Sequence, residues 1–118
     1  MVDSICVLIR KAPYGTENAF AGLRLALATA ANGIETKVVF VEEGVLNAVC
    51  DQKSSDIGMP SILDAIDDLL ALDVSLYCVE NSLAELDIGK ESLKEEMNCI
   101  EASALSDLVL GCQVMTTF

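Results

Sequence analysis

Short apolar runs that alternate with helix-patterned segments are the feature that most constrains the fold of this chain. Each run is too short for a helix and is bounded by charged or turn residues, which is typical of strands covered on both faces. No hairpin signal joins the runs, so helical crossovers should connect strands that lie parallel. The predicted strands span residues 4–10, 35–41, 74–78, 98–102 and 112–118. The pattern predicts one domain over residues 1–118, with a three-layer α/β/α fold around a five-stranded, mainly parallel sheet.

The segments between the strands carry helix start and stop signals. Thr16 suits an N-cap and Gly33 a stop for the first helix, while Pro60 suits the first turn of a later helix. Further short helices are predicted over 42–50, 79–86 and 103–111, and an exposed polar loop over 51–58. Helices are therefore expected in each connection between strands.

The first helix is apolar around most of its circumference. Between residues 19 and 31 only Arg24 and Thr29 are distinctly polar. A helix of this kind is normally buried on more than one side. We therefore expect a homo-oligomer in which a partner subunit supplies the second cover.

The charge balance argues against two classes of partner. Seven basic and nineteen acidic residues give a net charge of −12, whereas nucleic acids and anionic membranes attract positively charged surfaces. No stretch is long and apolar enough for a membrane helix. The N-terminus does not read as a signal peptide, because Asp3 precedes the first apolar run and Arg10 follows it. We expect a soluble cytoplasmic protein that binds neither nucleic acid nor membrane.

The cysteines and the absence of histidine limit the chemistry. The sequence has no histidine and no C-x-x-C pair, and its five cysteines are Cys6, Cys50, Cys78, Cys99 and Cys112. An odd number of cysteines without a signal peptide indicates free thiols in a reducing compartment. Scattered thiols do not suit a zinc site, and Ser-His-Asp or Cys-His catalysis needs histidine. We expect neither a metal nor an organic cofactor.

The position of Cys78 distinguishes it from the other thiols. In open α/β sheets, ligands bind beyond the carboxyl ends of the strands, and the predicted third strand ends at Cys78 just before a helix. The helix dipole, together with Arg10 and Lys11 at the same edge, would favour a thiolate. Glu80 and the acidic balance of the chain would oppose it. Spacing leaves a reactive Cys78 and a packed Cys78 equally open.

The other four thiols are better explained by structural roles. Cys6 and Cys99 fall inside predicted strands, where cysteine behaves as a small hydrophobe. Cys112 begins the last strand at the opposite edge. Cys50 closes a short helix beside a polar loop, so it could be oxidised without being catalytic.

Four segments carry a resemblance to a known family. The runs "ICVLIRKAPYGTENAFAGLRLALATAANG" and "VVFVEEGVLNAV" resemble the opening of DsrE/DsrF-like (TusD/TusC-like) sulfur-relay proteins. The segment "VSLYCVENSLAELDIG" is similar to the part that carries the family's sulfur-accepting cysteine, and "ASALSDLVLGCQVMTTF" is similar to its closing helix and strand. The resemblance implies a cytoplasmic sulfurtransferase that carries sulfane sulfur as a persulfide on Cys78 and passes it to a cysteine of a partner protein.

The resemblance also implies partners and pocket walls. It implies trimers or hexamers, alone or with sister subunits, that exchange sulfur with donor and acceptor proteins in tRNA thiolation or sulfur oxidation. Glu80 and Asn81 depart from the smaller or more apolar residues expected there. Besides Arg10 and Lys11, the residues expected around the sulfur are Pro13, Tyr14, Gly15, Glu43, Gly44 and Asn47.

Two other functions remain open at this point. The chain could be a non-catalytic subunit of a sulfur-relay complex, whose apolar helix and acidic surface serve assembly. It could also be a small-anion or nucleotide-binding module that uses the "KAPYGT" turn and the helix N-terminus behind it.

Overall fold

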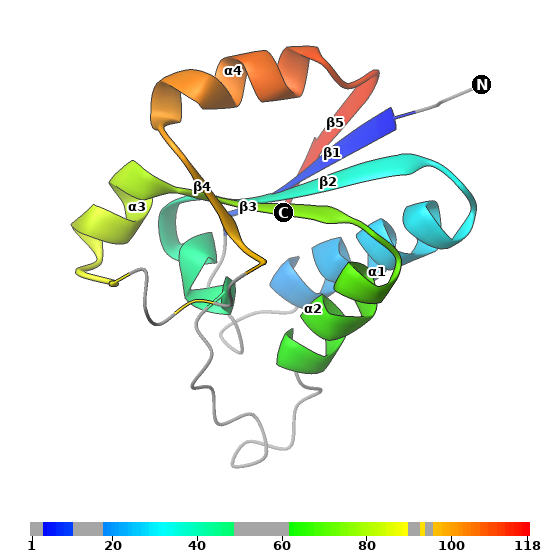
Figure 1. The fold of residues 1–118 in the computed structure, drawn as a ribbon, viewed down its shortest axis with the longest axis horizontal. Helices are drawn as coiled ribbons and strands as arrows, with labels where there is room; N and C mark the ends of the chain where they lie inside the picture. The colour runs from blue at the N-terminus through cyan, green and yellow to red at the C-terminus, as the bar shows by residue number, and fades with distance from the viewer. Residues whose placement is uncertain (1–3, 11–17, 49–61, 90–92, 94–95) are drawn as a thin grey trace.

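A five-stranded sheet forms the centre of the molecule, which is known from a computed structural model (Figure 1). The structure describes residues 4–10, 18–48, 62–89, 93 and 96–118. All four strand pairings are parallel, and the strand order is β4-β3-β2-β1-β5. The strands are β1 (Ser4–Ile9), β2 (Glu35–Phe40), β3 (Ser75–Val79), β4 (Asn98–Ile100) and β5 (Val114–Thr117). The prediction of an α/β fold around a parallel sheet is confirmed.

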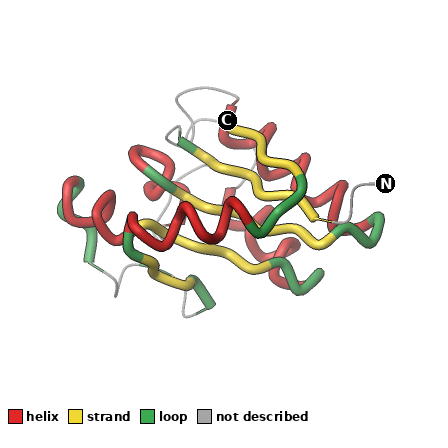
Figure 2. Tube along the Cα trace, turned by 90° about the horizontal axis from the view of Figure 1, so that it is seen from above, coloured by secondary structure: helices red, strands yellow, loops and turns green. Residues whose placement is uncertain are grey.

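The helices lie on both sides of this sheet. They are α1 (Asn18–Ala31), the 3₁₀ helix η1 (Glu42–Ala48), α2 (Ile62–Ala71), α3 (Glu80–Glu85) and α4 (Ala102–Leu110). Helices α1 and α2 cover one face, and α4 crosses the opposite face (Figures 1 and 2). This arrangement is the predicted three-layer architecture.

The element boundaries differ from the predicted ones by a few residues, and two backbone conformations explain part of this. Gly33, with φ +82°, adopts the left-handed conformation that ends α1, as the sequence predicts. Glu42 also has a positive φ, of 56°, so the chain leaves the extended conformation at this point and β2 ends at Phe40. Strand β3 continues one residue further than predicted, to Val79.

The face covered by α1 and α2 holds most of the apolar core. Its fully buried large side chains come from strands and helices alike: Ile9, Leu23, Phe40, Ile66, Leu69 and Leu76. Burying one such side chain stabilises the fold by about 1.5–3 kcal/mol. This layer therefore contributes much of the stability of the chain.

The face covered by α4 is packed less deeply. Cys6, Val39 and Val79 are buried beneath it, but none of the residues of α4, all of which the structure describes, is fully buried. Leu110, at the end of α4, is 81% exposed, and Met115 on edge strand β5 is 49% exposed. The two faces of the sheet thus differ sharply in how completely they are covered.

Helix α1 does not bury its whole circumference within this chain. Leu23 and Ala26 are buried, while Leu25 and Leu27 are half-buried and Arg24 is exposed. The expectation that a partner subunit covers the remainder stays a prediction. Within the described ranges, no helix has both the length and the apolar character that crossing a membrane would need.

Candidate functional site

Cys78 occupies the penultimate position of β3, near the carboxyl edge of the sheet. Its side chain is fully buried and belongs to the core cluster on the α1 and α2 face. Burial raises the pKa of the Cys78 thiol to about 12, with a smaller contribution from the neighbouring Cys99. The thiol is therefore protonated at neutral pH.

The sequence left a reactive and a packed Cys78 equally open, and the burial and raised pKa of this thiol favour packing. The argument for a thiolate assumed that β3 ends at Cys78 and that the side chain reaches the rim of the sheet. Because β3 continues to Val79, Cys78 keeps the alternation of a strand and points into the helix-covered layer. Loss of hydration then outweighs any gain from the short helix that follows.

Arg10 lies at the predicted edge, where it pairs with a carboxylate. Its Nε donates a hydrogen bond to Oε2 of Glu42 at 3.0 Å, and more than half of each side chain is exposed. Its backbone N–H donates to the carbonyl oxygen of Phe118 at 2.7 Å. The Arg10–Glu42 ion pair joins the carboxyl ends of β1 and β2. The shift in the pKa of Cys78 is caused by burial and by Cys99, not by Arg10.

The turn after β2 is held tightly against the end of β1. The backbone N–H of Glu42 donates to Oγ of Ser82 at 2.8 Å, and Ser82 is buried. A Cβ at Gly44 would collide with the carbonyl oxygen of Ile9 and lie 2.6 Å from its carbonyl carbon. Gly44 is thus required for η1 to pass close to β1. It shapes the edge of the sheet through its backbone.

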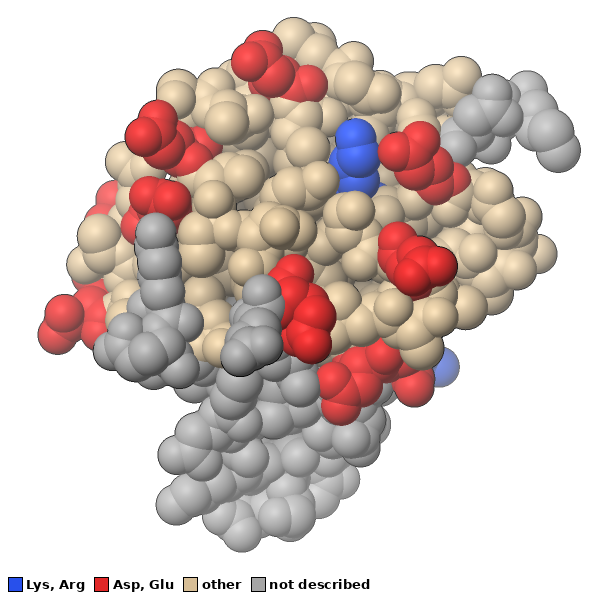
Figure 3. Space-filling model, in the orientation of Figure 1, with Lys and Arg blue, Asp and Glu red and all other residues tan. Residues whose placement is uncertain are grey.

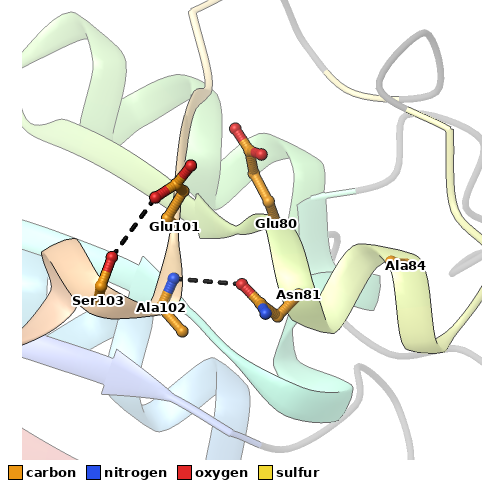
Figure 4. Close-up of a pocket in the computed structure, with 6 residues that line it drawn as sticks. All are labelled: Glu80, Asn81, Ala84, Glu101, Ala102 and Ser103. Carbon is orange, nitrogen blue, oxygen red and sulfur yellow. Dashed lines mark hydrogen bonds between the residues drawn. The ribbon is translucent and has the colours of Figure 1, made fainter.

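An open groove of about 460 Å³ lies at the same edge, between α3 and the start of α4 (Figure 4). The backbone N–H of Ala102 donates to Oδ1 of Asn81 at 3.2 Å, and Oγ of Ser103 donates to Oε2 of Glu101 at 3.4 Å. The groove lies just beyond the carboxyl ends of β3 and β4, the strands that contain Cys78 and Cys99. Its lining residues are Glu80, Asn81, Ala84, Glu101, Ala102 and Ser103.

The charges of this region do not suit an anion. Glu80 and Glu101 both line the groove, and acidic side chains are spread over the face of the molecule in Figure 3, where basic ones are sparse. Among the described residues, no cluster of three or more His, Cys, Asp or Glu side chains could hold a metal ion.

Comparison with known families decides how this thiol-bearing edge should be classified. The sequence model of the DsrE/DsrF-like family matches residues 3–118. The chain belongs to the DsrE/DsrF-like family. The resemblance noted in the sequence is thereby confirmed, for a family that serves in general in sulfur relay.

Solved structures of low sequence identity share the fold of this DsrE/DsrF-like chain. The ychN protein from E. coli aligns with a TM-score of 0.89 and 21% identity, covering 98% of this chain and 99% of that one. Protein MTH1491 from Methanobacterium thermoautotrophicum aligns with a TM-score of 0.75 and 12% identity, covering 98% of each chain. These likenesses establish the fold.

Two curated archaeal relatives match part of this DsrE/DsrF-like chain. Uncharacterized protein MK0008 of Methanopyrus kandleri is 35% identical over 66 residues, which are 56% of this chain and 53% of that protein. Uncharacterized protein MJ0989 of Methanocaldococcus jannaschii is 36% identical over 66 residues, which are 56% of each protein. The match spans about half the length of each relative.

The structure describes some of the predicted site residues. Arg10 directly follows β1, and Cys78 is the penultimate residue of β3. Glu43 and Gly44 lie in η1 after β2, and Glu43 is exposed. Asn47 lies in η1, but its side chain is outside the described residues. The same holds for the whole of Lys11, Pro13, Tyr14 and Gly15, and for Cys50.

Nothing in the sequence pointed to a pairing of Cys99 with Cys78. The strand pairing places Cys78 directly opposite Cys99 on β4, and both side chains pack in the same core cluster. Cys99 is partly exposed. Both cysteines are penultimate in strands at the same edge, so knowing that β3 and β4 are neighbours would have revealed the pair.

Proposed function

We propose that this DsrE/DsrF-like chain is a sulfur-relay protein in which Cys78 accepts sulfane sulfur as a persulfide and yields it to a cysteine of a partner protein. The observation that carries the proposal is the place of Cys78: one residue from the carboxyl end of β3, in a chain that matches this family over residues 3–118. That edge is where open α/β sheets bind their ligands.

The proposed reaction needs only thiol chemistry. The Cys78 thiolate attacks the outer sulfur of a donor persulfide, a new S–S bond forms to Cys78, and the donor leaves as a thiolate. Transfer to the acceptor repeats the exchange with the roles reversed. The sulfane sulfur keeps its oxidation level, so neither an oxidant nor a cofactor is required.

Burial of Cys78 fits storage of sulfur better than rapid exchange. With a pKa of about 12, the thiol is a weak nucleophile towards reagents in solution at neutral pH. A persulfide formed there would be shielded from water and from small reductants by the same apolar layer. We infer that loading requires either movement of the edge of the sheet or a second thiol that is more accessible.

The proposal is tested by the intact mass of the reduced protein after exposure to inorganic polysulfide, followed by peptide mapping. The wild type should gain one reducible sulfur atom on Cys78, and Cys78→Ser and Cys78→Ala should lack it. Cys6→Ser is the matched control, because Cys6 is also fully buried in a strand and has a raised pKa, of about 11. Failure of the wild type and of Cys6→Ser to gain sulfur on the Cys78 peptide would refute a carrier role for Cys78.

A second candidate function is that of a non-catalytic subunit of a sulfur-relay complex. The complete burial of Cys78 and the exposed apolar side chains of Leu110 and Met115 favour it. In that case Cys78 should react no faster than Cys6, the other fully buried thiol, and Cys78→Ser should leave assembly unchanged. The anion or nucleotide alternative places its site at the "KAPYGT" turn, which lies outside the described residues, and so it stays a prediction.

The partners follow from the proposed chemistry. We infer a homo-oligomer, a trimer or a hexamer with or without sister subunits, together with a sulfur donor protein and a sulfur acceptor protein. Delivery of the sulfur to a tRNA-thiolating system and delivery to sulfur oxidation would both use this step. Free thiols are compatible with a cytoplasmic location.

A further inference from the structure

We propose that Cys99 is the port through which sulfur reaches and leaves Cys78, so that the two thiols form an intramolecular relay. The inference rests on the proposed carrier function of Cys78. It starts from the strand pairing, in which Cys78 lies opposite Cys99 with Tyr77 opposite Asn98 before it and Val79 opposite Ile100 after it.

The two thiols share one face of the sheet. Cys78 belongs to the core cluster on the α1 and α2 side, and Cys99 packs against that cluster. Their neighbours Val79 and Ile100 belong to the cluster on the opposite side, as the alternation of a strand requires. The side chain of Asn98 donates from Nδ2 to the carbonyl oxygen of Leu76 at 3.1 Å, which fixes β4 in this register.

The exposure of the two thiols differs in the way that a relay needs. Cys78 is fully buried, whereas Cys99 is partly exposed. Strand β4 is at the edge of the sheet. A donor can therefore approach Cys99 from outside without opening the core around Cys78.

The spacing of neighbouring strands suits transfer of a sulfur atom better than formation of a disulfide. Adjacent strands lie about 4.8 Å apart. In the exchange, the transferred sulfur lies between two Sγ atoms at slightly more than an S–S bond length of about 2.05 Å from each, which places the two Sγ atoms between about 4 and 5 Å apart. A disulfide would need Cβ atoms about 3.8 Å apart, so the strands would have to move together.

The relay step balances without any further reactant. Cys78 attacks the outer sulfur of a Cys99 persulfide as it gives up its proton. The bond from that sulfur to Cys99 Sγ breaks while the bond to Cys78 Sγ forms. Cys99 leaves as a thiolate and takes up the proton. Unloading is the reverse reaction.

The chain provides a matched control on the other face of the sheet. Cys6 in β1 is fully buried, and burial, followed by the charge and a hydrogen bond of Cys112, raises the pKa of Cys6 to about 11. Cys112 is partly exposed. Cys6 and Cys112 therefore form a second pair of one buried and one partly exposed thiol, like Cys78 and Cys99, but nearer the amino end of the sheet.

The test compares how fast Cys78 gains sulfur from inorganic polysulfide in the wild type, Cys99→Ser and Cys112→Ser, with peptide mapping after rapid alkylation. Loss of the adjacent thiol should slow loading of Cys78 by about tenfold or more in Cys99→Ser. Cys112→Ser should load at close to the wild-type rate. In Cys78→Ser, sulfur should accumulate on Cys99.

The outcomes separate this inference from the proposed function. Loading of Cys78 at the wild-type rate in Cys99→Ser would overturn the relay and leave the carrier role intact. Loss of two hydrogen atoms with a Cys78–Cys99 crosslink, in place of sulfur gain, would also overturn the relay. Failure of the wild type itself to load Cys78 would refute the carrier role, and the relay with it.

Discussion

The two faces of the sheet contain similar thiol pairs under very different covers. One face is packed by α1 and α2 around fully buried side chains, and it holds Cys78 beside Cys99. The other is crossed by α4, which has no fully buried residue among those described, and it holds Cys6 beside Cys112. Because each pair joins a fully buried thiol to a partly exposed one, position along the strands, rather than residue type or burial of the thiols, distinguishes the proposed relay from the other pair.

The comparison separates stability from function. The deeply packed face anchors the fold and shields Cys78, whereas the thinly covered face leaves apolar side chains available for contacts with other chains. The following predictions test this division, beginning with the largest effect.

The largest effect should come from a cavity on the deeply packed face. Phe40→Ala removes a fully buried aromatic side chain at the end of β2 and should lower the free energy of unfolding by about 3–5 kcal/mol. Leu108→Ala removes a partly buried side chain from α4 and should cost well under half of that. Urea denaturation measures both, and equal losses would contradict the difference between the faces.

The backbone contact beside the site should give the next largest effect. A Cβ at Gly44 would collide with Ile9, so Gly44→Ala should destabilise the fold by about 1–3 kcal/mol. The control is Gly111→Ala, where the nearest atoms to a Cβ lie at 3.5 and 3.6 Å, an ordinary contact. Thermal unfolding of the two variants distinguishes them. A smaller loss in Gly44→Ala than in Gly111→Ala would show that η1 does not lie against β1 as described.

The thiols should make stability fall at alkaline pH. The pKa of Cys78 is about 12 in the fold against an ordinary 9.0, so the unfolded chain releases this proton at lower pH. The contribution of the protonated Cys78 thiol to the free energy of unfolding is fully present below about pH 9. It is lost as the pH rises towards 12, where the free energy of unfolding falls by about 1.4 kcal/mol per pH unit.

Replacing each buried thiol in turn tests which of them causes the fall of the free energy of unfolding at alkaline pH. Cys78→Ala should flatten the fall in stability over the whole interval up to about pH 12, whereas Cys6→Ala should flatten it up to about pH 11. Denaturation at a series of pH values gives both slopes. An unchanged slope in Cys78→Ala would mean that the thiol is solvated in the native state.

The smallest effect should come from the exposed ion pair. Arg10→Gln and Glu42→Gln each break a contact between side chains that are more than half exposed, so each should change the free energy of unfolding by less than about 1 kcal/mol. Sulfur loading of Cys78 should stay close to the wild-type rate in both. A marked loss of loading in Arg10→Gln but not in Glu42→Gln would instead assign Arg10 to the stabilisation of the sulfur anion.

The fold was largely predictable because it depends on local patterns. Alternating apolar runs and helix signals indicated the parallel sheet, and the stop at Gly33 is a left-handed residue in the structure. Strand order was not predictable, because it depends on how distant segments pack. The edge position of β4 and its pairing with β3 therefore had no signal in the sequence.

The site was predictable in its location but not in its depth. The rule for carboxyl ends of strands placed Arg10, Gly44 and Cys78 at one edge. The sequence left open whether Cys78 is reactive or packed; in the structure β3 continues to Val79, and the Cys78 side chain is fully buried, which raises its pKa. The partnership with Cys99 follows from the pairing of two strands, so it could emerge only once the register was known.

The most direct test of the account is a site-resolved time course of sulfur on the wild-type protein. Reduced protein would be mixed with inorganic polysulfide, alkylated at increasing times and mapped by peptide mass. The account predicts that sulfur appears first on Cys99 and then on Cys78 as it leaves Cys99, while the fully buried Cys6 stays unmodified. Sulfur that appears on Cys6 as fast as on Cys78, or that never reaches Cys78, would contradict it.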